Sequence, residues 1–190
     1  MTGAIAIAND DIIAYFLHNK ADGSPRLPVL QISGLIYMAD WMLAVYDKRT
    51  FTNLNWKFTS FGPEQPELQE YLLTSNKYNV SRYGDAETVS ISLSEDFKPE
   101  FNFSKRESII LEHVNAFSNK TKYNLDSLKH HLSNSYPVVT STPSDNYHNL
   151  LNFVDEFREL LKEKDNSISS SFVTKLISKE NVVNSNKIKR

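Results

Sequence analysis

The chain has 190 residues, 40% of them hydrophobic, and a formal net charge of −2. This length allows one sizeable core without disulfides or metals, and the near-neutral charge gives no global cationic field, which disfavours broad nucleic-acid binding. The sequence contains no cysteine, so disulfides, thiolate nucleophiles and cysteine-ligated zinc are excluded, and a reducing, cytoplasmic location is expected.

The apolar N-terminal stretch lacks the form of a signal peptide, because no Lys or Arg precedes it and Asn9, Asp10 and Asp11 interrupt it. Asn9 is instead predicted to cap a helix with the two aspartates in its first turn. The apolar face of this helix is formed by Ile12, Ile13, Phe16 and Leu17.

A second helix is predicted over residues 32–46, where apolar side chains cover nearly all sides, as in a central core helix. It contains Asp40, and the most apolar segment is too short for a bilayer, so we expect no membrane partner. Because an unpaired buried carboxylate is costly, Asp40 is interpreted as hydrogen-bonded or ion-paired rather than as a catalytic acid. Trp41 and Trp56 are interpreted as core residues.

Two segments show the period-two alternation of strands. Trp56 and Phe58 share one face of the first, and residues 88–93 form the second, so the two are predicted to pair in a small antiparallel sheet. Residues 74–87 between them are polar and turn-rich, which predicts a mobile surface loop. The predicted fold class is mainly α, with α+β character: a compact helical domain with a small antiparallel β-sheet.

Two further helix starts have local signals. Gly62-Pro63 is predicted to reverse the chain before a helix that begins near Pro66. Ser104 and Glu107 then stand in capping-box register before another helix.

The C-terminal part also has helical patterns. Residues 124–132 predict a short helix, and from Tyr147 a 3,4,3,4 apolar spacing predicts a helix with a narrow packing seam. An amphipathic pattern at residues 167–177 precedes a basic tail. We expect one domain over residues 1–157 and a helical extension over residues 158–190.

The sequence offers few residues for catalysis or metal binding. His130 and His131 are adjacent, so on a helix they point about 100° apart and do not form a chelating pair. No HExxH motif, phosphate-binding glycine loop or nucleophile elbow occurs. We therefore expect a protein that is not an enzyme and has no cofactor and no metal; the alternative is an enzyme with a dispersed site around Asp40 and the histidines.

Two motifs follow one another within residues 30–72. A helix carries Leu-Ile-Tyr-Met-Ala-Asp, and Phe-Gly-Pro then precedes a helix that starts Pro-Glu-Leu. The motif positions are Leu35, Tyr37, Asp40, Phe61, Gly62 and Pro63. In this order the chain resembles the SocA-like antitoxin family, also called the Panacea domain. Gly34 and Thr59 depart from the family, which tends to have lysine and tryptophan there.

The resemblance implies a cytoplasmic antitoxin of a bacterium or phage, without a cofactor, which neutralises a cognate toxin protein by direct binding. A related route is delivery of the toxin to a protease. The alternative within the same fold is a phage or prophage anti-defence protein that binds a host effector.

The partner surface is predicted to lie on the polar loop with Tyr78, Arg82 and Tyr83, and on a C-terminal stripe with Phe172 and Leu176. Tyrosine, asparagine and arginine in the loop are typical of adaptable protein contacts. The alternative for the stripe is that it packs back on the domain.

Overall fold

The computed structural model describes residues 5–20, 26–59, 62–83, 88–120, 127 and 144–149, all within the first of two compact units, Met1–Val154 and Asp155–Arg190. These residues form four helices and six strands, an α+β architecture, as predicted. In chain order the elements are α1 (Ile5–His18), β1 (Leu27–Pro28), α2 (Val29–Asp47), β2 (Asn55–Thr59), β3 (Gly62–Glu64), α3 (Pro66–Thr74), β4 (Tyr78–Tyr83), β5 (Thr88–Leu93), α4 (Lys105–Lys120) and β6 (Ser144–Asn149).

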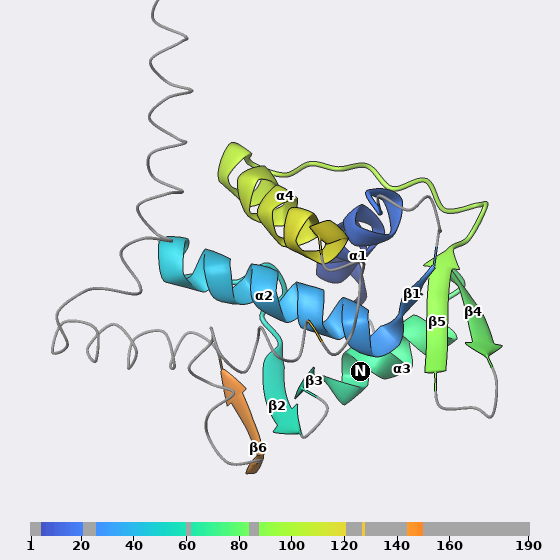
Figure 1. The fold of residues 1–190 in the computed structure, drawn as a ribbon, viewed down its shortest axis with the longest axis horizontal. Coiled ribbons are helices and arrows are strands. Elements are labelled where there is room, and N and C mark those ends of the chain that lie inside the picture. The colour runs from blue at the N-terminus through green and yellow to red at the C-terminus, as the bar shows by residue number, and fades with distance from the viewer. Residues whose placement is uncertain are drawn as a thin grey trace, which may run out of the picture. The chain divides into compact units, whose positions relative to one another are not determined.

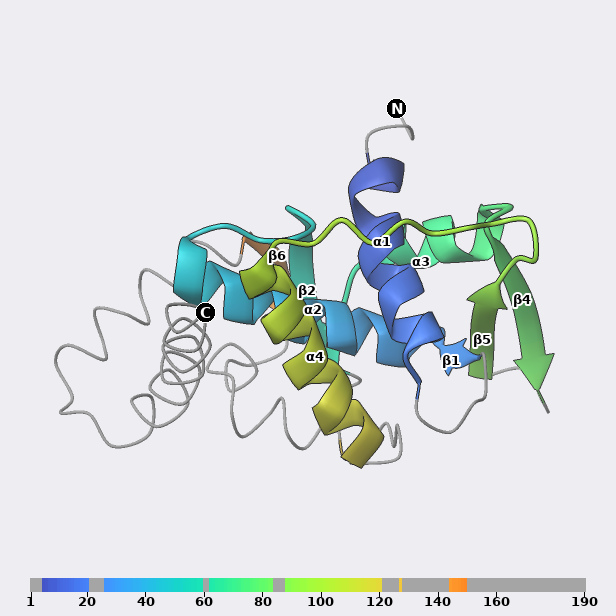
Figure 2. The ribbon, with the colours of Figure 1, turned by 90° about the horizontal axis from the view of Figure 1, so that it is seen from above.

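Helix α2 is the centre of the core. Helices α1 and α4 lie on one side of it, and β2, β3 and α3 lie on the other (Figures 1 and 2). By length and composition α2 could cross a membrane, but 83% of that stretch is buried inside the fold, as in the core helix of a soluble protein. The predicted central helix is confirmed, and so is the core position of Trp41 and Trp56, which are 5% and 0% exposed.

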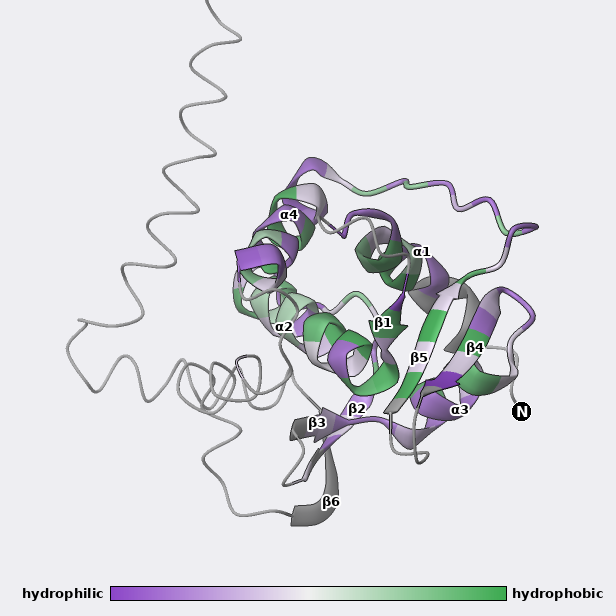
Figure 3. Cartoon of the chain, turned by 45° about the vertical axis from the view of Figure 1, so that its right-hand side comes forward, coloured by the Kyte–Doolittle hydropathy of each residue, from purple (hydrophilic) through white to green (hydrophobic). Residues whose placement is uncertain are grey.

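One antiparallel sheet has the strand order β1-β5-β4. The predicted strand at residues 88–93 is confirmed as β5, which carries alternating apolar and polar bands in Figure 3. The predicted loop over residues 74–87 is wrong in part, because Tyr78–Tyr83 form β4 and pair with β5 along its whole length. Backbone pairing with β5 has overridden the polar composition of this segment.

A second antiparallel sheet has the order β3-β2-β6. The predicted pairing of the Trp56 segment with residues 88–93 is therefore wrong, because the two strands lie in different sheets. The chain reversal predicted at Gly62-Pro63 falls directly before them. Thr59 and Gly62 pair at the ends of β2 and β3, and Pro63 lies in β3 opposite Phe58.

The helix predicted from Tyr147 is also wrong at its start. Residues 144–149 form β6, which pairs with β2 and brings Trp56 opposite His148. The hydrogen bonds with β2 favour a strand here, and they outweigh the local apolar spacing that favours a helix.

The observed starts of α1 and α3 can be compared with the caps predicted from the sequence. Helix α1 begins at Ile5, so Asn9 lies inside the helix and is not its cap. Pro66 occupies the first turn of α3 as predicted, with the Gln65 side chain accepting a hydrogen bond from the Leu68 N–H at 2.8 Å.

Three predictions lie outside the described residues, apart from residue 127. They are the helices at residues 124–132 and 167–177 and the domain boundary after residue 157.

Candidate functional site

The motif residues that the structure describes lie inside the fold. Leu35 and Tyr37 on α2 are fully buried, and Pro63 is buried in β3. Gly62 is described only by its backbone, and Phe61 lies outside the described residues. The motif therefore builds the scaffold and does not present these side chains to a partner.

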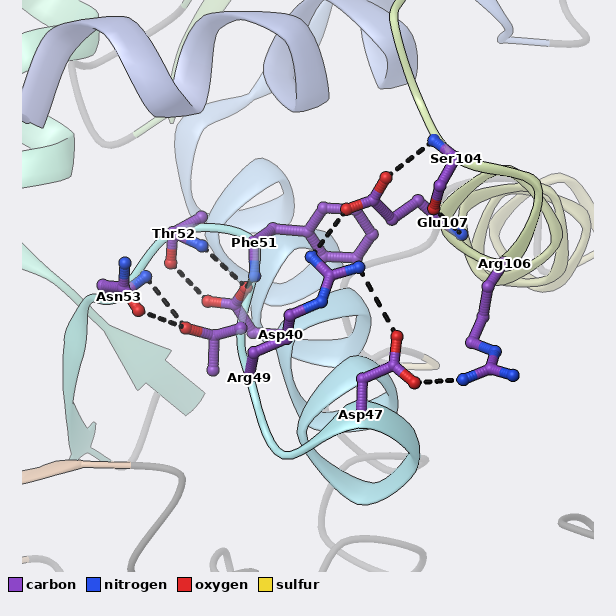
Figure 4. A network of polar contacts seen from close by, with 10 residues as sticks. Asp40, Asp47, Arg49, Phe51, Thr52, Asn53, Ser104, Arg106 and Glu107 are labelled. Carbon is purple, nitrogen blue, oxygen red and sulfur yellow. Dashed lines mark hydrogen bonds and ion pairs between the residues drawn. The ribbon is translucent and has the colours of Figure 1, made fainter.

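Asp40 fixes the turn that leads from α2 to β2. Its Oδ1 accepts hydrogen bonds from the backbone N–H groups of Phe51 at 2.8 Å and Thr52 at 3.1 Å, and its Oδ2 accepts one from the Thr52 hydroxyl (Figure 4). The carboxylate thus pairs backbone N–H groups of the turn that would otherwise be buried without an acceptor. The hydrogen-bonded interpretation of Asp40 is confirmed.

Burial governs the titration of Asp40. It raises the pKa of the carboxyl from 3.8 to about 7, although the hydrogen bonds from Thr52 and Phe51 lower it. Trp56 also lowers the pKa slightly, while its indole Nε1–H makes no hydrogen bond of standard geometry to any described residue. Asp40 therefore holds the turn with a carboxyl that binds its proton at a higher pH than an exposed aspartate does.

An ion-pair network joins the end of α2 to the start of α4 (Figure 4). Arg49 donates to Glu107 at 2.7 Å and lies 3.4 Å from Asp47, which also pairs with Arg106. Burial alone would raise the pKa of Glu107, but the hydrogen bonds from Arg49 and Ser104 outweigh it and lower the pKa. The Arg49 side chain is 46% exposed, so the network contributes modestly to stability.

The same glutamate completes the predicted capping box of α4. The Ser104 N–H donates to Glu107 Oε2 at 2.7 Å, and the Glu107 N–H donates to Ser104 Oγ at 3.3 Å. The prediction from the Ser-x-x-Glu spacing is thus confirmed.

A second polar cluster surrounds Asp10, which is only 4% exposed in the middle of α1. Its carboxylate accepts hydrogen bonds from the Tyr71 hydroxyl at 2.7 Å and the Tyr78 hydroxyl at 2.6 Å, and it pairs with Lys77. These partners come from α3, from β4 and from the segment between them. Asp10 therefore ties three elements together with charge-assisted bonds.

The pKa values of Tyr78 and Lys77 are both raised in the cluster around Asp10. Burial first, and then the hydrogen bond to Asp10, raises the pKa of the Tyr78 hydroxyl well above its ordinary value. The bond to Asp10 also raises the pKa of the Lys77 ammonium, which lies 5.3 Å from the Phe97 ring centroid in a cation–π contact. The Tyr78 hydroxyl and the Lys77 ammonium therefore keep the protons that they donate to Asp10 at neutral pH. We call this cluster the Asp10 lock, because it fixes the start of β4 to α1.

Sequence reasoning missed this lock. The sequence indicates only a first-turn residue at Asp10, because its partners are 61 to 68 positions further along the chain. The one signal in the sequence is its spacing: Asp10 stands three and seven positions before Ile13 and Leu17, on the apolar face of the helix, where a carboxylate needs partners.

The predicted partner-binding residues do not lie in one surface loop. Tyr78 is 5% exposed and bonded to Asp10, so the prediction that its side chain faces a partner is wrong. Arg82 is exposed on β4, and the side chain of Tyr83 is not described. Phe172 and Leu176 lie outside the described residues.

Within the part of the chain that the structure describes, no group of three His, Asp or Glu side chains is arranged to hold a metal ion. The comparisons add no relative: no protein-family model, no curated protein and no solved structure matches the chain.

Proposed function

We propose that this protein is an antitoxin that neutralises a cognate toxin protein by stoichiometric binding, with residues 1–157 as a compact, mainly helical SocA-like domain. The proposal starts from the resemblance of residues 30–72 to the SocA-like antitoxin family.

The observation that supports it most is how the motif residues work together in the structure. Asp40 holds the turn before β2, β2 pairs with the strand that contains Pro63, and α3 begins at Pro66. Residues that are conspicuous as a sequence motif thus serve one structural unit, which is the behaviour expected of a fold signature.

Co-expression with the adjacent open reading frame tests the proposal. We expect the neighbouring gene to arrest growth when it is induced alone, growth to return when both genes are expressed, and the two proteins to elute together in size-exclusion chromatography. A copy of this gene with an early stop codon controls for effects of the transcript. A harmless neighbour, or a toxic one that this protein does not relieve, would contradict the antitoxin function.

The amount of protein required separates binding from the protease route. Binding requires about one antitoxin per toxin, whereas delivery to a protease rescues growth with far less and makes the toxin disappear. An anti-defence protein is distinguished by its partner, because it would protect a phage against a host effector and leave the neighbouring gene product unbound.

A further inference from the structure

Strand β4 is the outer strand of its sheet. The order β1-β5-β4 leaves one long side of β4 without a neighbouring strand among the residues that the structure describes, and β4 is the outermost strand on that side in Figures 1 and 2. An edge of this kind offers backbone groups to another extended chain.

The register identifies the backbone groups that face outward. The Ser94 N–H donates to the Lys77 carbonyl oxygen at 2.9 Å, one position before the Tyr78–Leu93 pair. Hydrogen-bonded and non-bonded pairs alternate in an antiparallel ladder, so Asn79 and Ser81 bond to β5. The N–H and C=O groups of Val80 and Arg82 consequently point away from β5, toward the open edge.

The side chains at these two positions are suited to a partner. Val80 is 38% exposed and Arg82 is exposed, and both lie on the face of the strand that also carries Tyr78. Arg82 makes no ion pair with any residue in the described ranges. One exposed apolar side chain and one exposed cation that forms no ion pair with the described residues therefore stand two residues apart.

The edge strand is also anchored at its start and paired along one side. Tyr78 starts the strand and is bonded to Asp10, which pairs in addition with Lys77 and Tyr71. A strand that is already ordered loses little conformational entropy when a second strand is added, so its backbone bonds contribute more to affinity.

We propose that the β4 edge binds an extended segment of the partner protein as an additional antiparallel strand, with an acidic residue opposite Arg82 and an apolar residue opposite Val80. Because the strands are antiparallel, the partner segment reads acidic residue, any residue, apolar residue. This inference rests on the proposed binding function and names the surface and the partner chemistry that serve it.

A second copy of the chain fits the edge less well. The segment Tyr78–Tyr83 contains no acidic residue, so pairing of two β4 edges places a second Arg82 on the same face with no charge to compensate it. Like charges across a sheet destabilise the pairing, whereas opposite charges favour it.

Backbone hydrogen exchange and two synthetic peptides test the proposal on the purified full-length protein. The peptides are Ser-Gly-Thr-Glu-Thr-Val-Thr-Ile-Gly-Ser and the same sequence with Lys in place of Glu. In the free protein we expect fast exchange at the amides of Val80 and Arg82 and slow exchange at those of Asn79 and Ser81. The Glu peptide should slow exchange at Val80 and Arg82 and should bind roughly tenfold more tightly than the Lys peptide.

Charge reversal provides the matched control. In Arg82→Glu the preference should reverse in favour of the Lys peptide, while the far-ultraviolet circular dichroism and the slow exchange at Asn79 and Ser81 stay unchanged. Equal binding of both peptides, or binding without protection of Val80 and Arg82, would overturn the proposal. If protection of the Val80 and Arg82 amides instead rose with protein concentration in the absence of peptide, the edge would bind a second copy of the chain and not a partner segment.

The outcome does not depend on the toxin experiment. Peptide binding with reversed preference in Arg82→Glu would stand even if the adjacent gene proved harmless, and the antitoxin function would then be withdrawn alone. Rescue of growth without any peptide binding at β4 would keep the antitoxin function and remove the edge as its surface.

Discussion

At the scale of single residues, Asp40 couples the stability of the turn before β2 to pH. The carboxyl titrates near pH 7 in the folded chain and near 3.8 when exposed. Between these values the folded state holds a proton that the unfolded state has released, so the free energy of unfolding is largest below about pH 4 and falls as the pH rises toward 7. The contribution of this one group declines by about 1.4 kcal/mol per pH unit in that window.

Asp40→Asn should remove this dependence, because the amide has no proton to lose and still offers an oxygen to the Phe51 and Thr52 N–H groups. We expect the variant to gain stability relative to the wild type from pH 5 to pH 7, measured by urea denaturation at each pH. Asp96→Asn, at an exposed position, serves as the control. Parallel pH profiles for Asp40→Asn and the wild type would show that Asp40 does not titrate in this range.

Tyr78 provides a test of the Asp10 lock. Tyr78→Phe removes a buried hydroxyl that donates to the Asp10 carboxylate and keeps the ring contacts with Tyr71 and Phe97. A hydrogen bond to a charged group contributes about 1.5–3 kcal/mol, so we expect a loss of that order in the free energy of unfolding. Tyr71→Phe removes the other phenol bond at a half-buried position and should cost less. If Tyr78→Phe lowered the free energy of unfolding no more than Tyr71→Phe does, the bond from Tyr78 to Asp10 would not be the main contact of the lock.

These two aspartates differ in what the sequence could reveal. Asp40 stands in an otherwise apolar helix, so the need for a hydrogen-bond partner was evident from the sequence, and its partners lie only 11 and 12 residues away. Asp10 lies beside Asp11 near a chain end, which is an ordinary position for acidic residues. Its partners become visible only when the tertiary fold brings α3 and β4 to α1.

At the scale of elements, local signals predict several helices and strands but not how the strands pair. The apolar periodicity of α2, the Ser104–Glu107 box of α4 and the alternation in β5 are contained in consecutive residues, and all three are confirmed. Which strand a segment pairs with is set by non-local contacts. The alternation at Trp56 therefore predicts a strand but does not predict which sheet it joins.

The cap of α4 can be tested directly. Ser104→Ala removes the hydroxyl that accepts from the Glu107 N–H and should lower the free energy of unfolding by about 1 kcal/mol, while Ser104→Gly should cost only a few tenths. Ser108→Ala, inside the same helix, is the matched control and should be neutral or slightly stabilising. The quantity to measure is the urea midpoint at constant m-value. A loss in Ser108→Ala as large as that in Ser104→Ala would assign the effect to helix packing rather than to the cap.

At the scale of the whole molecule, the described residues of the unit Met1–Val154 share one core around α2. Helices α1, α3 and α4 and both sheets pack around α2, and the side-chain contacts of Asp10 and Glu107 join elements of this unit. Helix α2 contributes more buried apolar side chains to this core than any other single element does. Stability should therefore reside in the unit Met1–Val154.

Truncation after residue 157 tests this division and the predicted domain boundary together. We expect the shortened chain to unfold in one cooperative transition, with a Tm within about 3 °C of the full chain, because a change of 1 kcal/mol shifts Tm by only about 2–4 °C at this size. Differential scanning calorimetry of both chains provides the measurement. Substituting Phe172→Asp and Leu176→Asp in the full chain is the control, since it removes the apolar stripe without removing residues. A large drop in Tm in both the truncated and the substituted protein would mean that the stripe packs on the domain, and that the stable unit extends beyond residue 157.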